Sequence, residues 1–349
     1  MTSNYLAATV HRTQKAKPVH PIVPALGLFL LAPLIAEFLL GNMSITHLGL
    51  LVILAPVYGG GALLIRECVR RAGRGWPGIF VLALAYGVLE EAFLTQSLFN
   101  PNYLALNLDL LKPAFLPPFG IGAWYTIFVL TLHTVWSISV PVALIEALVP
   151  TRADSPWLGE YGLGVCAMVF TFACVSLGNF SARADAHHFV ASRPQFAWSA
   201  IIILALIAAA LWAPRRIAAS ATGAVPSPWI LGAGSLAVAS AFLLIPREWG
   251  WWAVVAYLSL DAIAILAIAM WSGRVGWSAL HKLNVAGGAA MAYACHAFVQ
   301  TPSLGKVDSI TRIGNLLFAV MAASLVAAGA RKAGAPARQN GTSSSVTPC

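Results

Sequence analysis

Long apolar runs dominate this sequence, and short polar connections separate them. Runs close to the ~20 residues that a helix needs to cross a bilayer recur at ten positions. We expect a spanning helix at each of them, at about residues 21–41, 48–66, 77–97, 122–147, 158–180, 196–213, 227–245, 250–271, 280–299 and 313–330. The predicted fold class is therefore all-α: a polytopic helical bundle in a membrane.

Composition agrees with this pattern, because 59% of the 349 residues are hydrophobic, 9% are charged and the mean hydropathy is +0.79. A soluble domain of this size cannot bury so much apolar surface. The net charge of +9 is better explained by orientation in the membrane than by nucleic-acid binding. The five cysteines are scattered, without a CxxC or a metal-ligand spacing, so we expect no disulfide.

Basic residues are divided unevenly between the two sides of the predicted bundle. With the N-terminus in the cytoplasm, all but six of the 21 lysines and arginines fall on the inner side; the six are Lys112, Arg183, Arg193, Arg247, Lys306 and Arg312. Cytoplasmic loops carry an excess of Lys and Arg, which favours ten spans with both termini cytoplasmic. The expected parts are a cytoplasmic N-terminal segment (1–20), one transmembrane domain (21–330) and a disordered cytoplasmic tail (331–349).

Two predicted outer connections are longer than turns. Residues 99–118 hold four prolines and a moderately apolar middle, and we expect them to dip back into the membrane or to lie on its surface as a lid. Residues 181–195 carry Asp185, His187 and His188.

The strongest chemical signal is the pair Glu90–Glu91 inside the third apolar run. A carboxylate at membrane depth costs roughly 2.5–3.5 kcal/mol on insertion scales, and its default interpretation is functional. The pair needs a polar partner, a water-filled cavity or a proton that neutralises one member. Helical spacing places Ser97 on the face of Glu90, and Gly87 and Thr95 on the face of Glu91.

Other ionisable residues share the middle-to-outer layer of the predicted bundle. His133 lies about 11 residues below the outer start of the fourth span, roughly 16 Å at 1.5 Å per residue. Glu37 falls in the outer half of the first span, Asp261 near the middle of the eighth and His296 in the outer half of the ninth. A common polar cavity would explain this layer; the alternative is a set of hydrogen bonds that only fixes helix packing.

A buried carboxylate pair beside a histidine can perform general acid–base chemistry. One glutamate would take a proton from water, while the histidine positions that water or stabilises an oxyanion. We expect no metal, because HExxH is absent and the distance in sequence between Glu and His gives no ligand geometry. No cofactor is predicted either.

These residues resemble the motifs of the CAAX prenyl protease and bacteriocin-processing superfamily of intramembrane glutamate proteases. Its first motif, Glu-Glu-x-x-x-Arg, is matched by Glu90 and Glu91, with Thr95 in the arginine position. Its second motif, Phe-x-x-x-His, is matched at His133, with Val129 in the phenylalanine position.

The third motif of that superfamily, His-x-x-x-Asn, is matched in its histidine alone. His187 and His188 are the candidates, and Ala191 and Ser192 stand in the corresponding asparagine positions. The resemblance covers residues 90–192.

The resemblance implies an intramembrane endopeptidase that works without a metal. It assigns Glu90 or Glu91 as the base, His133 as its partner, and His187 or His188 as a donor at the oxyanion. The missing arginine and asparagine leave two versions open, an active peptidase and a relative that has lost activity.

Two other classes of function stay open. A proton-coupled transporter or permease would use Glu37 and Asp261 with the same cavity, and Gly59–Gly61 could break a helix at a substrate site. The pair Gly287–Gly288 is better explained by close helix packing. The second class is a non-catalytic scaffold. Expected partners are the lipid bilayer and a peptide or small-molecule substrate entering from the membrane or the outer side, not nucleic acid.

Overall fold

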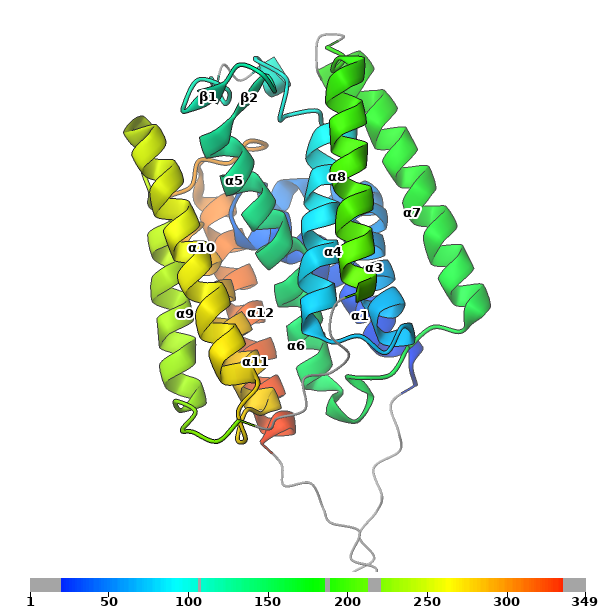
Figure 1. Ribbon diagram of the computed structural model, residues 1–349, viewed down its shortest axis with the longest axis vertical. Coiled ribbons are helices and arrows are strands. Elements are labelled where there is room, and N and C mark those ends of the chain that lie inside the picture. Colours follow the sequence, from blue (N-terminus) through cyan, green and yellow to red (C-terminus); the bar gives the residue numbers. More distant parts are fainter. Residues whose placement is uncertain (1–19, 106–107, 186–188, 213–220, 335–349) are drawn as a thin grey trace, which may run out of the picture.

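The computed structural model describes residues 20–105, 108–185, 189–212 and 221–334 (Figure 1). These residues fold almost entirely as helices that stand side by side in one bundle. The α-helices are α1 (Ile22–Pro33), α2 (Leu51–Leu54), α3 (Gly60–Arg71), α4 (Trp76–Leu89), α5 (Ala123–Leu132), α6 (Val140–Leu148), α7 (Glu160–Phe180), α8 (Arg193–Trp212), α9 (Pro228–Leu243), α10 (Trp251–Ser272), α11 (Ala279–His296) and α12 (Ser309–Ala333). The predicted all-α class is confirmed.

Several spanning segments are composite, because wider or tighter turns join the α-helices end to end. The π-helical segments are η1 (Leu34–Leu39), η3 (Ala55–Gly59), η4 (Glu90–Leu94), η6 (His133–Ser139) and η8 (Ser181–Asp185). The 3₁₀ segments are η2 (Ile45–Leu50), η5 (Tyr103–Ala105), η7 (Pro150–Arg152) and η9 (Arg247–Trp249). The strands β1 (Phe115–Leu116) and β2 (Ile121–Gly122) pair antiparallel, with Phe115 opposite Gly122.

Helices occur at all ten positions that the apolar pattern predicts. In the described part of the chain, eight of them are long and apolar enough to cross a membrane. The other two are α9, a shorter apolar helix of 16 residues, and α11, which has 18 residues and is less apolar. Length and apolar composition together identify a multi-pass membrane protein.

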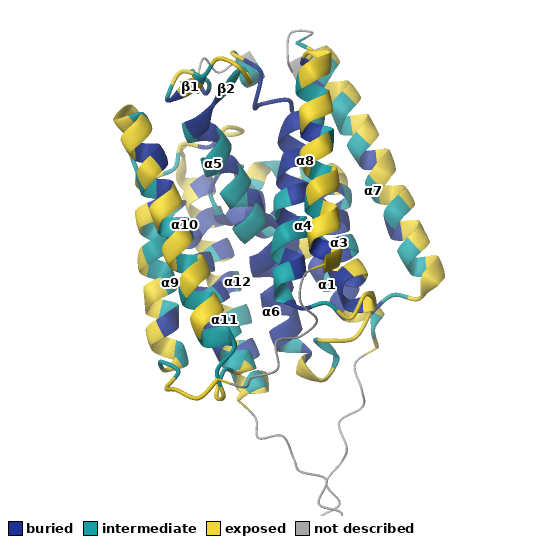
Figure 2. Cartoon of the chain, viewed as in Figure 1, coloured by how far each residue is buried: buried dark blue, intermediate teal, exposed yellow. Residues whose placement is uncertain are grey.

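The bundle has an inner set of buried helices and an outer set whose residues are largely exposed (Figure 2). The spans that contain α1, α4 and α5–α6 each bury 61% of their most apolar window. In contrast, the spans of α7 and α8 each bury 11% of theirs, although they are equally apolar. A helix that exposes apolar residues all round is stable only in lipid, so these two helices lie at the periphery of the bundle.

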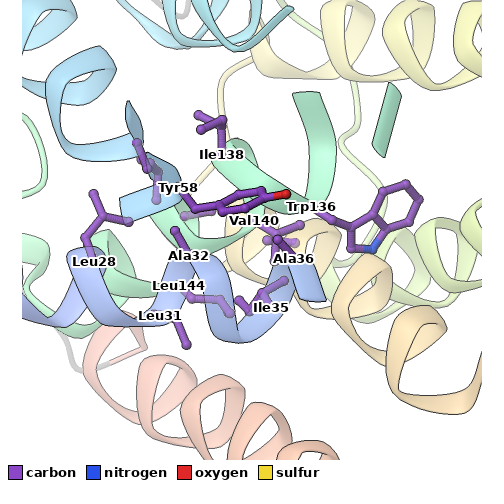
Figure 3. Close-up of a cluster of buried hydrophobic side chains, with 14 of the residues drawn as sticks. Leu28, Leu31, Ala32, Ile35, Ala36, Tyr58, Trp136, Ile138, Val140 and Leu144 are labelled. Carbon is purple, nitrogen blue, oxygen red and sulfur yellow. The ribbon is translucent and has the colours of Figure 1, made fainter. Parts of the chain in front are cut away.

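The centre of the bundle is packed with aliphatic and aromatic side chains. Figure 3 shows the Tyr58 ring between α1 side chains and residues that come from η6 and α6. Nearby, the ring of Trp136 is stacked on that of Tyr293, with centroids 4.4 Å apart. The indole nitrogen of Trp136 donates to the Ala289 carbonyl at 2.8 Å, so its one polar group is satisfied.

Glycines allow the closest helix contacts. A Cβ atom on Gly288 of α11 would overlap the Gly232 carbonyl oxygen on α9. A Cβ on Gly59 would overlap the Phe29 carbonyl oxygen on α1. Both contacts agree with close packing, and Gly288 confirms the interpretation preferred for the Gly287–Gly288 pair.

The connection between η4 and α5 closes the end of the bundle that carries the β1–β2 hairpin, here called the hairpin end. The helix stops after Leu94, because Gln96 takes a left-handed backbone conformation with φ 54°. Ser97 and Asn100 are then buried against the bundle, being 0% and 3% exposed. The start of this connection is therefore part of the protein interior.

Candidate active site

Four π-helical segments carry a group of buried polar residues inside the bundle. Glu37 lies on η1, Tyr58 on η3, the Glu90–Glu91 pair on η4 and His133 on η6. A π turn is rare and is frequently found at functional sites. The convergence of four such turns therefore marks this region as a candidate site.

A proline lies within or next to three of these irregular turns. Pro33 precedes η1, Pro56 lies within η3, and Pro141 follows η6. Proline lacks the backbone N–H group and clashes with the carbonyl four residues earlier, so a regular α-helix cannot continue through it. The chain widens locally instead, and the side chains in the wider turn point in directions that a 3.6-residue period does not predict.

His133 and Glu91 form the shortest contact of the site. The imidazole Nε2 lies 2.7 Å from Glu91 Oε1, and both side chains are about nine-tenths buried or more. The other ring nitrogen, Nδ1, lies 3.1 Å from the Ser137 hydroxyl. Gly87 allows this approach, since a Cβ there would stand 3.1 Å from the Cβ of His133. Gly87 and Ser137 therefore both lie against His133.

The second oxygen of Glu91 is surrounded by hydroxyl groups. Oε2 accepts from Thr95 Oγ1 at 3.2 Å, from the Tyr125 hydroxyl at 3.4 Å and from the Ser97 hydroxyl. The prediction that Ser97 lies on the face of Glu90 is wrong. The helix ends at Leu94 in a π turn, and the left-handed backbone that follows turns Ser97 back toward Glu91.

Glu90 is held differently. Its Oε2 lies 2.8 Å from the same His133 Nε2, yet this oxygen accepts no hydrogen bond among the described residues, and the residue is only 4% exposed. One imidazole nitrogen carries at most one hydrogen, which can serve only one of the two carboxylates. Glu90, Glu91 and His133 each offer a ligand atom, all within 4.8 Å of one another, so the three side chains could hold a metal ion.

Glu37 reaches the site through Tyr58. The Tyr58 hydroxyl donates to Glu37 Oε1 at 2.6 Å, and the Asn42 amide donates to Oε2 at 2.6 Å. The Tyr58 ring is stacked beside the His133 ring, with centroids 5.9 Å apart and an angle of 23° between the planes. Glu37 is therefore an anchored neighbour of the site rather than a member of the Glu–His contact.

The remaining predicted residues do not join this group among the described contacts. Asp261 accepts from Thr131 Oγ1 at 3.0 Å, where α10 packs against α5. His296 Nε2 lies 3.2 Å from Gln300 Oε1 just beyond the end of α11. The common polar layer is thus narrower than predicted. His187 and His188 lie outside the residues that the structure describes.

A second buried polar group, here called the arginine cluster, comprises Arg66, Glu67, Arg70 and Glu146. Arg66 lies 2.7 Å from Glu67 and 3.1 Å from Glu146, and Arg70 lies 2.8 Å from Glu146. Arg66 also donates to three backbone carbonyls of the connection after α6, and its guanidinium lies 3.3 Å from the centre of the Trp157 ring. These contacts are those of a structural cluster that joins α3, α6 and the connection after α6.

Comparison with known proteins identifies the family of the chain but no individual relative. An uncharacterized membrane protein family matches residues 26–339. The chain belongs to this family. No curated protein and no solved structure matches it. Nothing in these comparisons links the family to the CAAX prenyl protease superfamily, so chemical arguments for this family member depend on its side-chain geometry.

Sequence reasoning missed Tyr58, Tyr125 and Asn42 as parts of the site in this family member. A buried tyrosine normally finds a partner for its hydroxyl, so the two tyrosines within apolar spans were the available signal. Asn42 follows the first span directly, and its partner Glu37 lies five residues earlier. Neither signal says which helices meet, which is why only the structure identifies these residues.

Proposed function

We propose that this family member is a membrane-embedded hydrolase of the peptidase kind, in which Glu90, Glu91 and His133 activate water without a metal ion. One observation carries the proposal: the buried Oε2 of Glu90 lies beside His133 Nε2 and accepts no hydrogen bond in the described part of the chain. A general base must be within hydrogen-bond reach of the proton that it removes. Glu90 meets this condition better than Glu91, whose two oxygens are occupied by His133 and three hydroxyl groups.

The roles of the three residues follow from their contacts. Water attacks the carbonyl carbon of an amide substrate while its proton passes to Glu90. The carbon–nitrogen bond then breaks, the proton passes to the leaving nitrogen, and the products are an acid and an amine. His133 is held by Glu91 and Ser137 beside the free oxygen of Glu90, where it positions the attacking water. The substrate is a peptide or small amide that enters from the membrane or from the hairpin end.

Cleavage of membrane peptides tests the proposal. The purified protein is reconstituted into vesicles with a library of internally quenched apolar peptides, and new amino termini are labelled and identified by mass spectrometry. We expect cleavage by the wild type and a loss of about 10²-fold or more in Glu90→Gln, because a general base contributes about 10²–10⁴-fold. The matched control is Asp261→Asn, which neutralises a carboxylate outside the site and should cleave normally.

Equal cleavage by wild type and Glu90→Gln would contradict the proposal. So would the absence of cleavage by any sample, provided that a known intramembrane protease cuts the same library in the same vesicles.

Proton-coupled transport is a second candidate, and the Glu37–Tyr58 contact favours it. This contact links a second buried carboxylate to His133 through a stacked ring. Buried carboxylates that face histidines form proton relays in transporters. Proteoliposomes that contain a pH-sensitive dye separate the two functions: Glu37→Gln should abolish proton movement if the protein transports, and should leave peptide cleavage measurable if it hydrolyses.

We also infer the topology from charge. The uneven distribution of Lys and Arg supports two cytoplasmic termini, with residues 21–330 as a single transmembrane domain and the hairpin end outside. A cysteine introduced at Asp109, in a background without the native cysteines, should react with a membrane-impermeant thiol reagent added to whole cells. Asp109 pairs with Lys112 at 2.8 Å in the exposed connection. Labelling only after the cells are broken would show that the hairpin end faces the cytoplasm and would contradict this topology.

A further inference from the structure

The meeting point of Glu90, Glu91 and His133 also fits a cation. Two carboxylate oxygens approach one imidazole nitrogen at 2.8 and 2.7 Å, so three electron-rich atoms converge in the protein interior. A single hydrogen on Nε2 satisfies Glu91 and leaves Glu90 Oε2 without a hydrogen bond from any residue that the structure describes. An unpartnered carboxylate oxygen that is buried and aimed at two other donor atoms is the feature that a bound cation would resolve.

The donor set indicates which cation. Zinc binds His nitrogen at about 2.0–2.1 Å and carboxylate oxygen at about 2.0–2.2 Å, usually with four ligands in a tetrahedron. Donors of such a site are roughly 3.3 Å apart, so Nε2 and the two oxygens need to separate by only about half an ångström. Calcium and magnesium require about six or more oxygen ligands, and the group offers two carboxylates and one nitrogen.

The surrounding hydroxyl groups support the same inference. Metal-bound histidines nearly always hydrogen-bond through their second ring nitrogen, and ligating carboxylates are themselves hydrogen-bonded. Ser137 occupies Nδ1 of His133, and Thr95 and Ser97 occupy the outer oxygen of Glu91. These contacts orient three atoms toward one point: Glu91 Oε1, Glu90 Oε2 and His133 Nε2.

We propose that Glu90, Glu91 and His133 form a binding site for a single divalent transition-metal ion, for which Zn²⁺ is the probe. The three protein ligands leave a fourth position for water. A bound ion occupies the free oxygen of Glu90, so Zn²⁺ inhibits the metal-free hydrolysis proposed above. The binding claim is independent of that function, whereas the inhibition claim rests on it.

Metal binding to the full chain in detergent tests the site. The protein is purified with an affinity tag that lacks histidine, treated with a chelator and equilibrated with Zn²⁺. Bound metal is measured by elemental mass spectrometry, and Co²⁺ replaces Zn²⁺ for visible absorption. We expect one ion per chain in the wild type, at least tenfold weaker binding in Glu90→Gln and His133→Gln, and altered Co²⁺ bands in His133→Gln.

The control variants are Glu37→Gln and Asp261→Asn, which neutralise buried or half-buried carboxylates outside the three ligands and should bind one ion. If His133→Gln does not fold, Glu90→Gln alone carries the test, since it changes one atom of a side chain without a hydrogen bond at that position. Sub-stoichiometric binding by the wild type, or equal binding by wild type and Glu90→Gln, overturns the site.

The two proposals fail separately. Zinc binding without any peptide cleavage contradicts the hydrolase and retains the metal site. Cleavage without zinc binding contradicts the metal site and retains the hydrolase. Cleavage that saturating Zn²⁺ does not reduce, in a protein that binds the ion, contradicts the inhibition.

Discussion

The arginine cluster and the Glu90–Glu91–His133 site are both buried polar groups in one bundle, but they are satisfied to different degrees. In the arginine cluster two arginines face two glutamates, and every carboxylate oxygen accepts at least one hydrogen bond. In the other group two glutamates share one imidazole nitrogen, and Glu90 Oε2 accepts none among the described residues. α4 connects the two regions, since its first residue, Trp76, lines the same hollow as Glu146 and its last turn leads into η4.

This difference distinguishes a structural from a reactive arrangement. Removing one partner from a satisfied buried ion pair exposes the others to an apolar interior, which costs about 3–5 kcal/mol. Removing a charge that lacks a partner costs little, because that charge was already destabilising. Natural sequences retain such unfavourable groups mainly where chemistry requires them.

The largest effect is expected for Arg66→Met in the arginine cluster. The substitution removes the buried guanidinium that lies 2.7 Å from Glu67, together with three hydrogen bonds to backbone carbonyls. We expect a loss of about 3–5 kcal/mol in the free energy of unfolding, measured by reversible denaturation in mixed micelles. The control is Arg71→Met, because the Arg71 side chain is 30% exposed and lies 4.0 Å from Glu67, and it should lose about 1 kcal/mol or less. Equal losses in the two variants would remove the distinction between a buried cluster and a surface pair.

A smaller loss is expected when the hydroxyl groups around Glu91 are removed. The double variant Thr95→Val with Ser97→Ala deletes two donors to Glu91 Oε2 and keeps the volume nearly constant. One hydrogen bond to a charged group contributes about 1.5–3 kcal/mol. Because Tyr125 still donates to the same oxygen, we expect the double variant to lose about as much as one such bond, together with reduced cleavage. Thr126→Val is the control, because its hydroxyl donates to the Gly122 carbonyl away from the site. A double variant with normal stability and cleavage would show that these hydroxyls do not hold Glu91.

A still smaller effect on stability, with a large effect on activity, is expected for Gly87→Ala. The new methyl group would stand 3.1 Å from the His133 Cβ and would displace the imidazole from the two carboxylates by a few tenths of an ångström. We expect about 1 kcal/mol of destabilisation and a clear loss of cleavage or zinc affinity. Gly164→Ala is the control, since no atom lies within 4 Å of the corresponding position on α7. Unchanged cleavage and zinc affinity in Gly87→Ala would show that the distance from His133 to the carboxylates is not critical.

The sequence predicts the fold class and the three central residues of the site, for a simple physical reason. Apolar length alone identifies the spans, and the cost of charge at membrane depth draws attention to Glu90, Glu91 and His133. The structure brings these three together, as the distances of 2.7 and 2.8 Å show. Their chemical role stays a proposal.

The sequence does not predict how the site is completed. Regular helical spacing assigns Ser97 to Glu90, but the π turn and the left-handed Gln96 assign it to Glu91. Depth in a span does not determine which way a helix faces, so Asp261 lies at a suitable depth and yet pairs with Thr131. Tyr58 reaches His133 through contacts between helices that are distant in sequence, which no local pattern records.

The most direct test of the contrast between the two regions compares Glu90→Gln with Glu146→Gln in the same denaturation experiment. Both substitutions neutralise a buried glutamate and preserve its shape. We predict that Glu90→Gln keeps the wild-type free energy of unfolding within about 0.5 kcal/mol or raises it. Glu146→Gln should lose about 3 kcal/mol or more, because Arg66 and Arg70 lose the buried carboxylate that they share. A loss in Glu90→Gln as large as that in Glu146→Gln would show that the Glu90–Glu91–His133 group holds the helices together, and would contradict its assignment as a reactive site.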